Sequence, residues 1–301
     1  MKSTPATALR TPLLLAGLGA LALFIAGHTS PIALAQDDEG ADDEGGGSGG
    51  LLDIDIGDID LGDDSKGGEQ SATYEGQAAQ DAANYKAGTP VYITHTKGNI
   101  SVRCTDSDGI QARINFSIDG TKQDAMQRVG NGIGLRTYAS NTEGKVTSNV
   151  PGLQSGVEAI RAPLTVNLPR QAKVSITGGD GWIQVVGCTG TVKATTRKGG
   201  IFADGVLSSF DLSTSGGDIE VALDPTAVIT SSSRATATGG DVILRMPITQ
   251  KGNLSARGAE VAVEHLVNGT NTPTTVQGTL SDTGPSISVT AKGKVTITTP
   301  R

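Results

Sequence analysis

The sequence is poor in the residues on which most enzymes and metal sites depend. Aromatic residues make up 3% of the 301 residues, and the chain has two cysteines and three histidines. A core with so few rings must be filled by valine, isoleucine, leucine, alanine and threonine, which suits narrow β architectures. Neither His95 nor His265 has a second histidine or a cysteine at the spacing of a zinc site. We find no catalytic constellation and expect a protein that is not an enzyme and has no cofactor.

An apolar run long enough to remain in a membrane is also missing from the N-terminal segment. The run at residues 13–26 is shorter than the roughly 20 residues that a span needs. It follows Lys2 and Arg10 and precedes the small residues Ala33 and Ala35. This order is typical of a secretory signal peptide. We expect residues 1–35 to be the signal peptide, cleaved after Ala35, so that the mature protein has no transmembrane segment. It would be periplasmic, at the cell surface or extracellular.

The acidic charge is confined to one stretch of the chain. Residues 37–64 contain twelve acidic residues and no basic one, and the chain after them has 22 basic and 19 acidic residues. The folded part is therefore mildly basic although the whole chain has a net charge of −7, and no nucleic-acid partner is expected. Residues 36–89 are acidic, then rich in glycine and serine, and predict a disordered linker.

One island inside this linker alternates apolar and acidic residues between Leu51 and Leu61. The favoured interpretation is a chance alternation in disordered chain, since a lone strand in water has no partner. The alternatives are an acidic docking motif and a calcium-dependent strand.

From residue 91 onward, short alternating runs separated by glycine, aspartate and serine predict β-strands. One helix is predicted where Thr121 resembles an N-cap with Asp124 three residues later, and Gly130 is expected to end it. The predicted strands are residues 91–95, 99–104, 110–116, 164–168, 173–177, 182–186, 191–196, 218–223, 241–246, 260–264, 286–290 and 294–298.

Glycine recurs in pairs or near pairs, each followed by a strand, with a mean step of 21 residues. Such a period is typical of a solenoid whose coils stack and share one core. We therefore expect residues 90–301 to form a single all-β, β-solenoid-like domain of about 20 residues per coil; an antiparallel β-sandwich is the alternative. The repeat is measured between Gly179, Gly200, Gly217, Gly240, Gly258 and Gly284.

Several of these features occur together in a known group of proteins. A Gly-x-Ile-x-Val strand at residues 98–102, a central segment with a brief helix, and the run Val166-Asn167-Leu168-Pro169-Arg170 precede repeats of the form Thr-x-x-Gly-x-Ile-x-Val. In this order the chain resembles the bacterial putative-adhesin families of β-strand-repeat proteins over residues 91–301. The resemblance implies an extracytoplasmic β-solenoid-like domain without assigned catalysis, and it transfers no site residue.

Cys104 and Cys188 are the only cysteines, and in an exported protein an even number favours a disulfide. They follow two similar strand units, and stacking of those units would bring the sulfurs together. The alternative is two separate buried thiols.

Three aspartates and the single tryptophan are the remaining candidates. Asp180, Asp218 and Asp241 each follow a glycine pair, which suggests either a calcium ladder or, as we favour, aspartates that form turns. Trp182 could stack on a sugar ring, but packing at a coil corner is the favoured interpretation.

Three functions compete. The first is an exported non-enzymatic adhesion or scaffold protein that binds a surface polysaccharide or a protein partner through one face. The second is a polysaccharide-acting β-helix enzyme, which would need paired acid and base residues in a groove. The third is a self-assembling secreted subunit whose strand edges pair.

Overall fold

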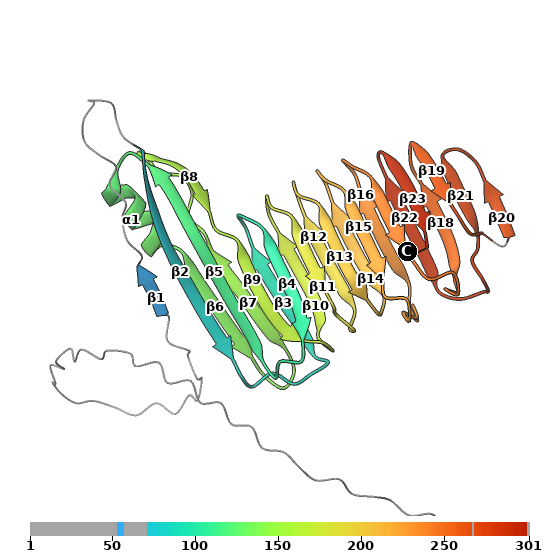
Figure 1. Cartoon of the computed structure of the whole chain (residues 1–301), viewed down its shortest axis with the longest axis horizontal. Helices are drawn as coiled ribbons and strands as arrows, with labels where there is room; N and C mark the ends of the chain where they lie inside the picture. Colours follow the sequence, from blue (N-terminus) through green and yellow to red (C-terminus); the bar gives the residue numbers. More distant parts are fainter. Residues whose placement is uncertain (1–52, 57–70, 267, 300–301) are drawn as a thin grey trace, which may run out of the picture. The chain divides into compact units, whose positions relative to one another are not determined.

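Side chains alternate between buried and exposed positions along most strands, as the period of two in the sequence predicts. The computed structural model describes residues 53–56, 71–266 and 268–299, all of them within the unit Ser48–Arg301. The expected signal peptide and most of the expected linker lie outside these residues. The described part of the chain is all-β with one helix, which confirms the predicted class (Figure 1).

The strands form two mixed sheets. Within the described residues the first sheet has 12 strands. In spatial order these are β1 (Asp53–Ile56), β2 (Ala72–Ala82), β5 (Ile110–Gly120), β9 (Leu164–Pro169), β4 (Ile100–Thr105), β11 (Ile183–Val186), β13 (Ile201–Val206), β15 (Ile219–Leu223), β17 (Val242–Arg245), β23 (Lys294–Thr298) and β19 (Glu260–Val263), with β8 (Val157–Arg161) paired to β5.

The second sheet has 11 strands within the described residues. Its spatial order is β20 (Asn268–Asn271), β21 (Thr275–Thr279), β18 (Asn253–Arg257), β22 (Ser286–Ala291), β16 (Ser233–Ala237), β14 (Phe210–Thr214), β12 (Val192–Thr196), β10 (Lys173–Gly178), β3 (Pro90–His95), β7 (Gly144–Asn149) and β6 (Gly134–Ala139).

From β10 to β17 the chain alternates strictly between the two sheets. Each of these strands pairs in parallel with the next strand of its own sheet. In the first sheet Ile183, Ile201, Ile219 and Val242 lie in one register row, 18, 18 and 23 residues apart. Two layers around one core are compatible with a sandwich-like fold, while the parallel pairing is the feature on which a solenoid interpretation rests.

Aliphatic side chains fill the space between the sheets. In each sheet the inward side chain of one strand lies beside the inward side chain of the next, which gives rows of buried apolar residues. One row of the first sheet contains Ile100, Ile183, Ile201, Ile219, Val242 and Val295, and one row of the second contains Ile93, Ile176, Ala194, Leu212, Ala235 and Val289.

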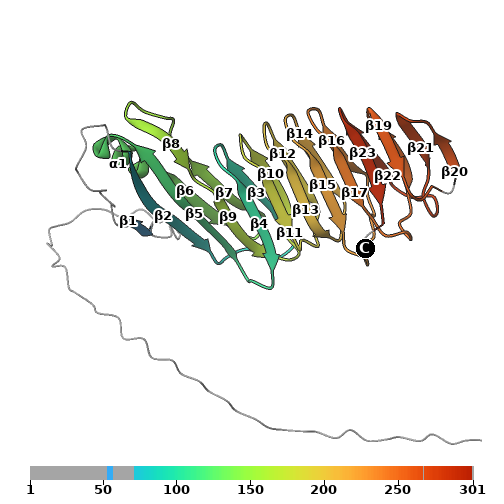
Figure 2. The same ribbon diagram turned by 45° about the horizontal axis from the view of Figure 1, so that its top comes forward.

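The order of strands in space departs from their order in the sequence near the C-terminal part. β22 pairs with β16 on one side and β18 on the other, and β23 lies between β17 and β19 (Figures 1 and 2). The coil that begins near Gly258 is therefore not the neighbour of the coil that begins near Gly240, as a simple succession of repeats would require. Residues 268–279 form the hairpin β20–β21, which pairs with β18.

The predicted linker extends too far. Residues 72–82, which we placed in it, form β2, and β2 pairs with β5 along its whole length. Tyr74 and Ala78 are buried on its inner side, so these two side chains anchor the strand. Asp53–Ile56, inside the island from Leu51 to Leu61, also form a strand, β1, which pairs with β2. We had expected this island to have no strand to pair with, and in the structure β2 is that strand.

Helix α1 (Gln123–Asn131) occurs where one was predicted, but both of its ends were predicted wrongly. The N-cap is Lys122 and not Thr121, and its side chain makes no capping bond. The helix continues through Gly130, which is buried. A Cβ at Gly130 would overlap the Tyr74 ring, so this glycine permits close packing against β2 and does not stop the helix.

Candidate functional site

Trp182 is held at the corner where the chain enters β11. Its N–H donates to Asn99 Oδ1 (3.2 Å), and its carbonyl accepts the N–H of Ile100 (2.9 Å). Because Ile183 points into the core, Trp182 points outward, and 37% of it is exposed. The indole is therefore exposed beside the start of β11, and hydrogen bonds to Asn99 and Ile100 hold its backbone.

Phe202 lies on β13, the next strand of the same sheet, and is 40% exposed. Its ring leans over Gly200, where an added Cβ would be 3.4 Å from two ring carbons. The Gly200 carbonyl accepts the N–H of Ile183, the residue after Trp182 (2.9 Å). Phe202 is thus exposed on β13, and Trp182 is exposed at the residue before the neighbouring strand β11. We call Trp182 and Phe202 the aromatic pair.

Polar side chains surround the aromatic pair. Ser101, Gln184, Phe202 and Glu220 occupy one outward row across β4, β11, β13 and β15. Within the described residues the side chains of Ser101 and Gln184 have no hydrogen-bond partner, whereas Glu220 forms an ion pair with Arg245. An amide and a hydroxyl are therefore available beside two apolar ring surfaces. Ring faces of this kind pack against the apolar face of a sugar, and polar groups at the edge fix its orientation.

A row of hydroxyl side chains runs along the outer side of the second sheet. Its members occupy matched register positions on seven adjacent strands, and none has a side-chain hydrogen bond within the described part of the chain. They are Thr147, Thr94, Thr177, Thr195, Ser213, Thr236 and Thr290.

The structure joins Cys104 of β4 to Cys188, which follows β11, by a disulfide with a Cα–Cα distance of 4.9 Å. The parallel pairing of β4 with β11 brings them together, although 84 residues separate them in the sequence. Both cysteines are buried, so the bridge links β4 to the residues that follow β11 from inside the core.

The three aspartates form no common cluster. Asp218 Oδ1 accepts the N–H of Asp241 (2.8 Å), whereas Asp180 pairs with Arg197 (3.2 Å) and Lys198 (3.4 Å). These contacts are those of aspartates that organise turns. Among the described residues, no group of three or more histidine, cysteine, aspartate or glutamate side chains could hold a metal ion.

The two histidines lie in contrasting environments. His95 is fully buried, and its Nδ1 is 2.5 Å from Ser148 Oγ. Burial lowers the pKa of His95 to about 4, although attraction to the nearby Ala162 carbonyl partly offsets this effect. His265 is exposed and follows β19 of the first sheet, where it lines a pocket.

Sequence reasoning singled out Trp182 but missed Phe202. The sequence did contain a signal for Phe202, because this residue follows Gly199-Gly200 and Ile201. In a strand that begins with a buried Ile201, the next side chain points outward. What the sequence could not supply was the register that sets β13 beside β11.

Comparisons with known proteins identify no family. No protein-family model matches the sequence, and no curated protein matches it. Among solved structures, the chain is similar to a putative cell adhesion protein from Clostridium sporogenes (TM-score 0.38, 10% identity, 74% of this chain and 99% of that one). It is also similar to a putative adhesin from Bacteroides fragilis (TM-score 0.27, 12% identity, 73% and 96%). These TM-scores are too low to carry fold or function across to this chain. Within the described residues, no helix has the length and apolar character of a membrane span.

Proposed function

We propose that this protein is an exported, non-enzymatic binding protein that attaches to a polysaccharide through the outer side of its first sheet. The observation that carries the proposal is the aromatic pair, since Phe202 is exposed on β13, Trp182 is exposed just before the neighbouring strand β11, and polar side chains flank them. Exposing the apolar rings of a tryptophan and a phenylalanine to water is unfavourable, and a ligand that covers them removes this cost.

The arrangement of strands supports an extended ligand. We interpret the alternating parallel path from β10 to β17 as a solenoid, because each coil repeats the same two-strand unit on the preceding one. Equivalent outward positions then recur at the spacing of neighbouring strands, about 4.8 Å. A polymer with repeating units can contact several coils at once, and the hydroxyl row offers a second such face.

Export is the remaining part of the proposal. Residues 1–35 have the charge and apolar pattern of a signal peptide, and the acidic residues that follow would act as a tether. The disulfide between Cys104 and Cys188 is compatible with an oxidising compartment.

Fluorescence gives a direct test, because Trp182 is the only tryptophan in the chain. The protein is titrated with soluble oligosaccharides of β-1,4-linked glucose, N-acetylglucosamine and galacturonate. We expect one class to shift or quench the emission saturably. Phe202→Ala should then weaken binding about tenfold, which corresponds to the loss of one aromatic stacking contact.

Tyr138→Ala is the matched control, since Tyr138 is an exposed aromatic residue on β6 of the second sheet. Equal effects of Phe202→Ala and Tyr138→Ala would contradict the proposed face, as would emission that no oligosaccharide changes. Release of new reducing ends during incubation would contradict the non-enzymatic assignment.

A further inference from the structure

A pocket of about 360 Å³ lies at the β17–β23–β19 end of the first sheet. In the strand order of that sheet, this end is separated from the aromatic pair by β15. β17, β23 and β19 are parallel neighbours in this sheet, and the pocket lies where these three strands end. Met246, Thr298 and Glu264, at or just beyond the three strand ends, line it. Its size falls at the lower end of pockets that bind small molecules.

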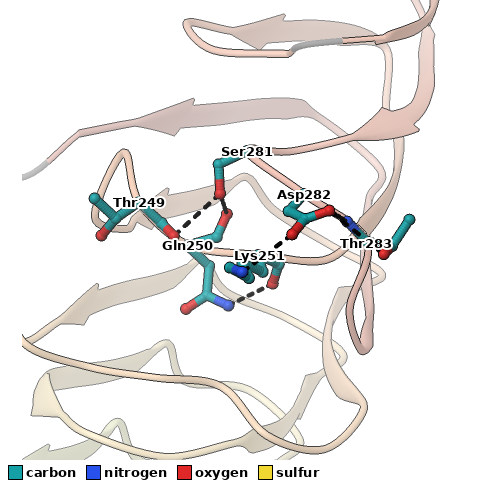
Figure 3. Close-up of polar contacts among 6 residues, drawn as sticks. All are labelled: Thr249, Gln250, Lys251, Ser281, Asp282 and Thr283. Carbon is teal, nitrogen blue, oxygen red and sulfur yellow. Dashed lines mark hydrogen bonds and ion pairs between the residues drawn. The ribbon is translucent and has the colours of Figure 1, made fainter.

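Two loops that close one side of the pocket are tied together (Figure 3). The Ser281 hydroxyl can donate to the Gln250 carbonyl (3.0 Å), and Lys251 forms an ion pair with Asp282 (3.0 Å). The Gln250 side chain is buried, and its Oε1 accepts the N–H of Ile229 (3.3 Å). The pocket is thus shaped by bonded loops before any ligand enters, which lowers the entropy cost of binding.

The floor of the pocket is apolar. Met246, Leu280 and Ile297 line it, and all three are buried. Ile248 stands at the rim and is 60% exposed, although it is a large apolar side chain. An apolar ligand segment would bury this side chain together with the floor.

Among the described residues, Glu264 is the only acidic residue of the lining, and no described lysine or arginine lines the pocket. Glu264 Oε2 accepts the N–H of Thr299 (3.1 Å), which fixes the carboxylate at the wall. Glu264 Oε1 accepts no hydrogen bond from the described residues, and no described cation forms an ion pair with this side chain. One carboxylate oxygen is therefore positioned beside an apolar floor and has no cationic partner in the described part of the chain.

We propose that this pocket binds a small amphipathic amine, with the alkyl part on the apolar floor and the ammonium group on Glu264. An ammonium group carries the charge and the donors that the free oxygen lacks, and it forms a charge-assisted hydrogen bond with a carboxylate. A ligand with a carboxylate head would meet repulsion from Glu264, and among the described lining residues it would find His265 but no lysine or arginine. This site is separate from the aromatic pair, so the two proposals succeed or fail independently.

Isothermal titration calorimetry of the full chain with n-octylamine, n-hexylamine and n-butylamine tests the site, each below its aggregation concentration. Octylamine should bind tightest, with affinity rising about threefold to fourfold for each methylene that the floor covers. Octanoate of equal chain length should bind at least tenfold more weakly. Emission from Trp182 should stay unchanged.

Glu264→Gln should weaken octylamine binding about tenfold or more while leaving the fold intact, because the amide oxygen can still accept the Thr299 N–H. Glu260→Gln is the matched control: Glu260 lies on β19 but pairs with Lys294 outside the pocket lining. Ile248→Ala should weaken binding severalfold without affecting stability, since the side chain is exposed. Octanoate binding as tightly as octylamine, or equal effects of the two glutamate variants, would overturn the proposal, and so would the absence of octylamine binding.

Discussion

Asp241 Oδ1 accepts the backbone N–H of Lys294 at 2.7 Å, and Gly293, the residue before Lys294, leaves the space that this carboxylate occupies. A Cβ at Gly293 would overlap the same Asp241 oxygen. The preceding corner is built in the same way, because Asp218 accepts the N–H of Asp241 and a Cβ at Gly240 would overlap the Asp218 carboxylate. A glycine before one strand and an aspartate before the neighbouring strand therefore form a single structural unit.

This unit predicts that Gly293→Ala and Asp241→Ala are not additive. An alanine at residue 293 forces the Asp241 carboxylate away and breaks its bond to Lys294, so each single change should cost about 1–2 kcal/mol of unfolding free energy. The double variant should cost about as much as either single one, as for any two changes that remove the same interaction. Urea denaturation of the four proteins measures the cycle.

Gly152→Ala is the control for this cycle, since a Cβ there has open space around it. Its effect should stay within about 0.5 kcal/mol. Full additivity of the Gly293 and Asp241 changes would show that the glycine has another role.

Loss of the disulfide should destabilise the protein markedly. The double change Cys104→Ser and Cys188→Ser removes a disulfide between residues that are 84 positions apart in the sequence. In the chain-entropy model, closing a loop of this length stabilises the folded state by about 4 kcal/mol. Urea denaturation compares this double variant with the parent, and titration of unreduced, denatured parent protein with a thiol reagent should detect no free thiol. Two thiols per chain in that titration would refute the bridge in solution.

Acidification should destabilise the protein through His95. Its pKa is about 4 in the folded state, and that of an unfolded histidine is about 6.5. Between these values the unfolded chain binds a proton that the folded chain does not, so stability is lost as the pH falls from about 6.5 to about 4. The loss amounts to about 3 kcal/mol.

Denaturation midpoints of the parent and of His95→Gln, measured from pH 7 to pH 4, test this prediction. The difference between their pH slopes isolates His95 from the carboxylates that titrate at the lower end. His265→Gln, which alters an exposed histidine, should keep the parental slope. A parental slope in His95→Gln would show that other groups cause the acid sensitivity.

The position of β22 between β16 and β18 predicts a long-range effect of truncation. A chain that ends after Thr283 keeps β18 and β21 but loses the strand that joins them to the rest of the second sheet. Hydrogen exchange should show lost amide protection in β18 and β21 and retained protection in β12. Parental protection of β18 in the truncated chain would contradict the strand order.

Local features were the ones that the sequence could predict. The segment Gly216-Gly217-Asp218 followed by alternating residues predicted a strand at 218–223, and β15 spans Ile219–Leu223. Alternating residues predict a strand because only one side of each strand faces the core. The glycines mark corners where neighbouring backbone segments approach closely.

Features that depend on partners were missed. β2 is rich in alanine, which has a weak strand preference, and its stability comes from pairing with β5. Glycine spacing indicates where individual turns occur, but it does not indicate which strands lie side by side. The positions of β22 and β23 in their sheets could therefore not be predicted from it. The pocket around Glu264 depends on that place, because Thr298 and Thr299 form part of its wall.

The place of β22 and β23 also has a consequence for the order of events during synthesis. A chain that emerges with its N-terminal residues first presents β16, β17, β18 and β19 before residues 286–298 exist to separate them. Until then the edges of β16 and β18 have no correct neighbour, and prolonged exposure of such edges favours aggregation or proteolysis. Entry of β22 then gives β16 and β18 their shared neighbour, and β23 does the same for β17 and β19.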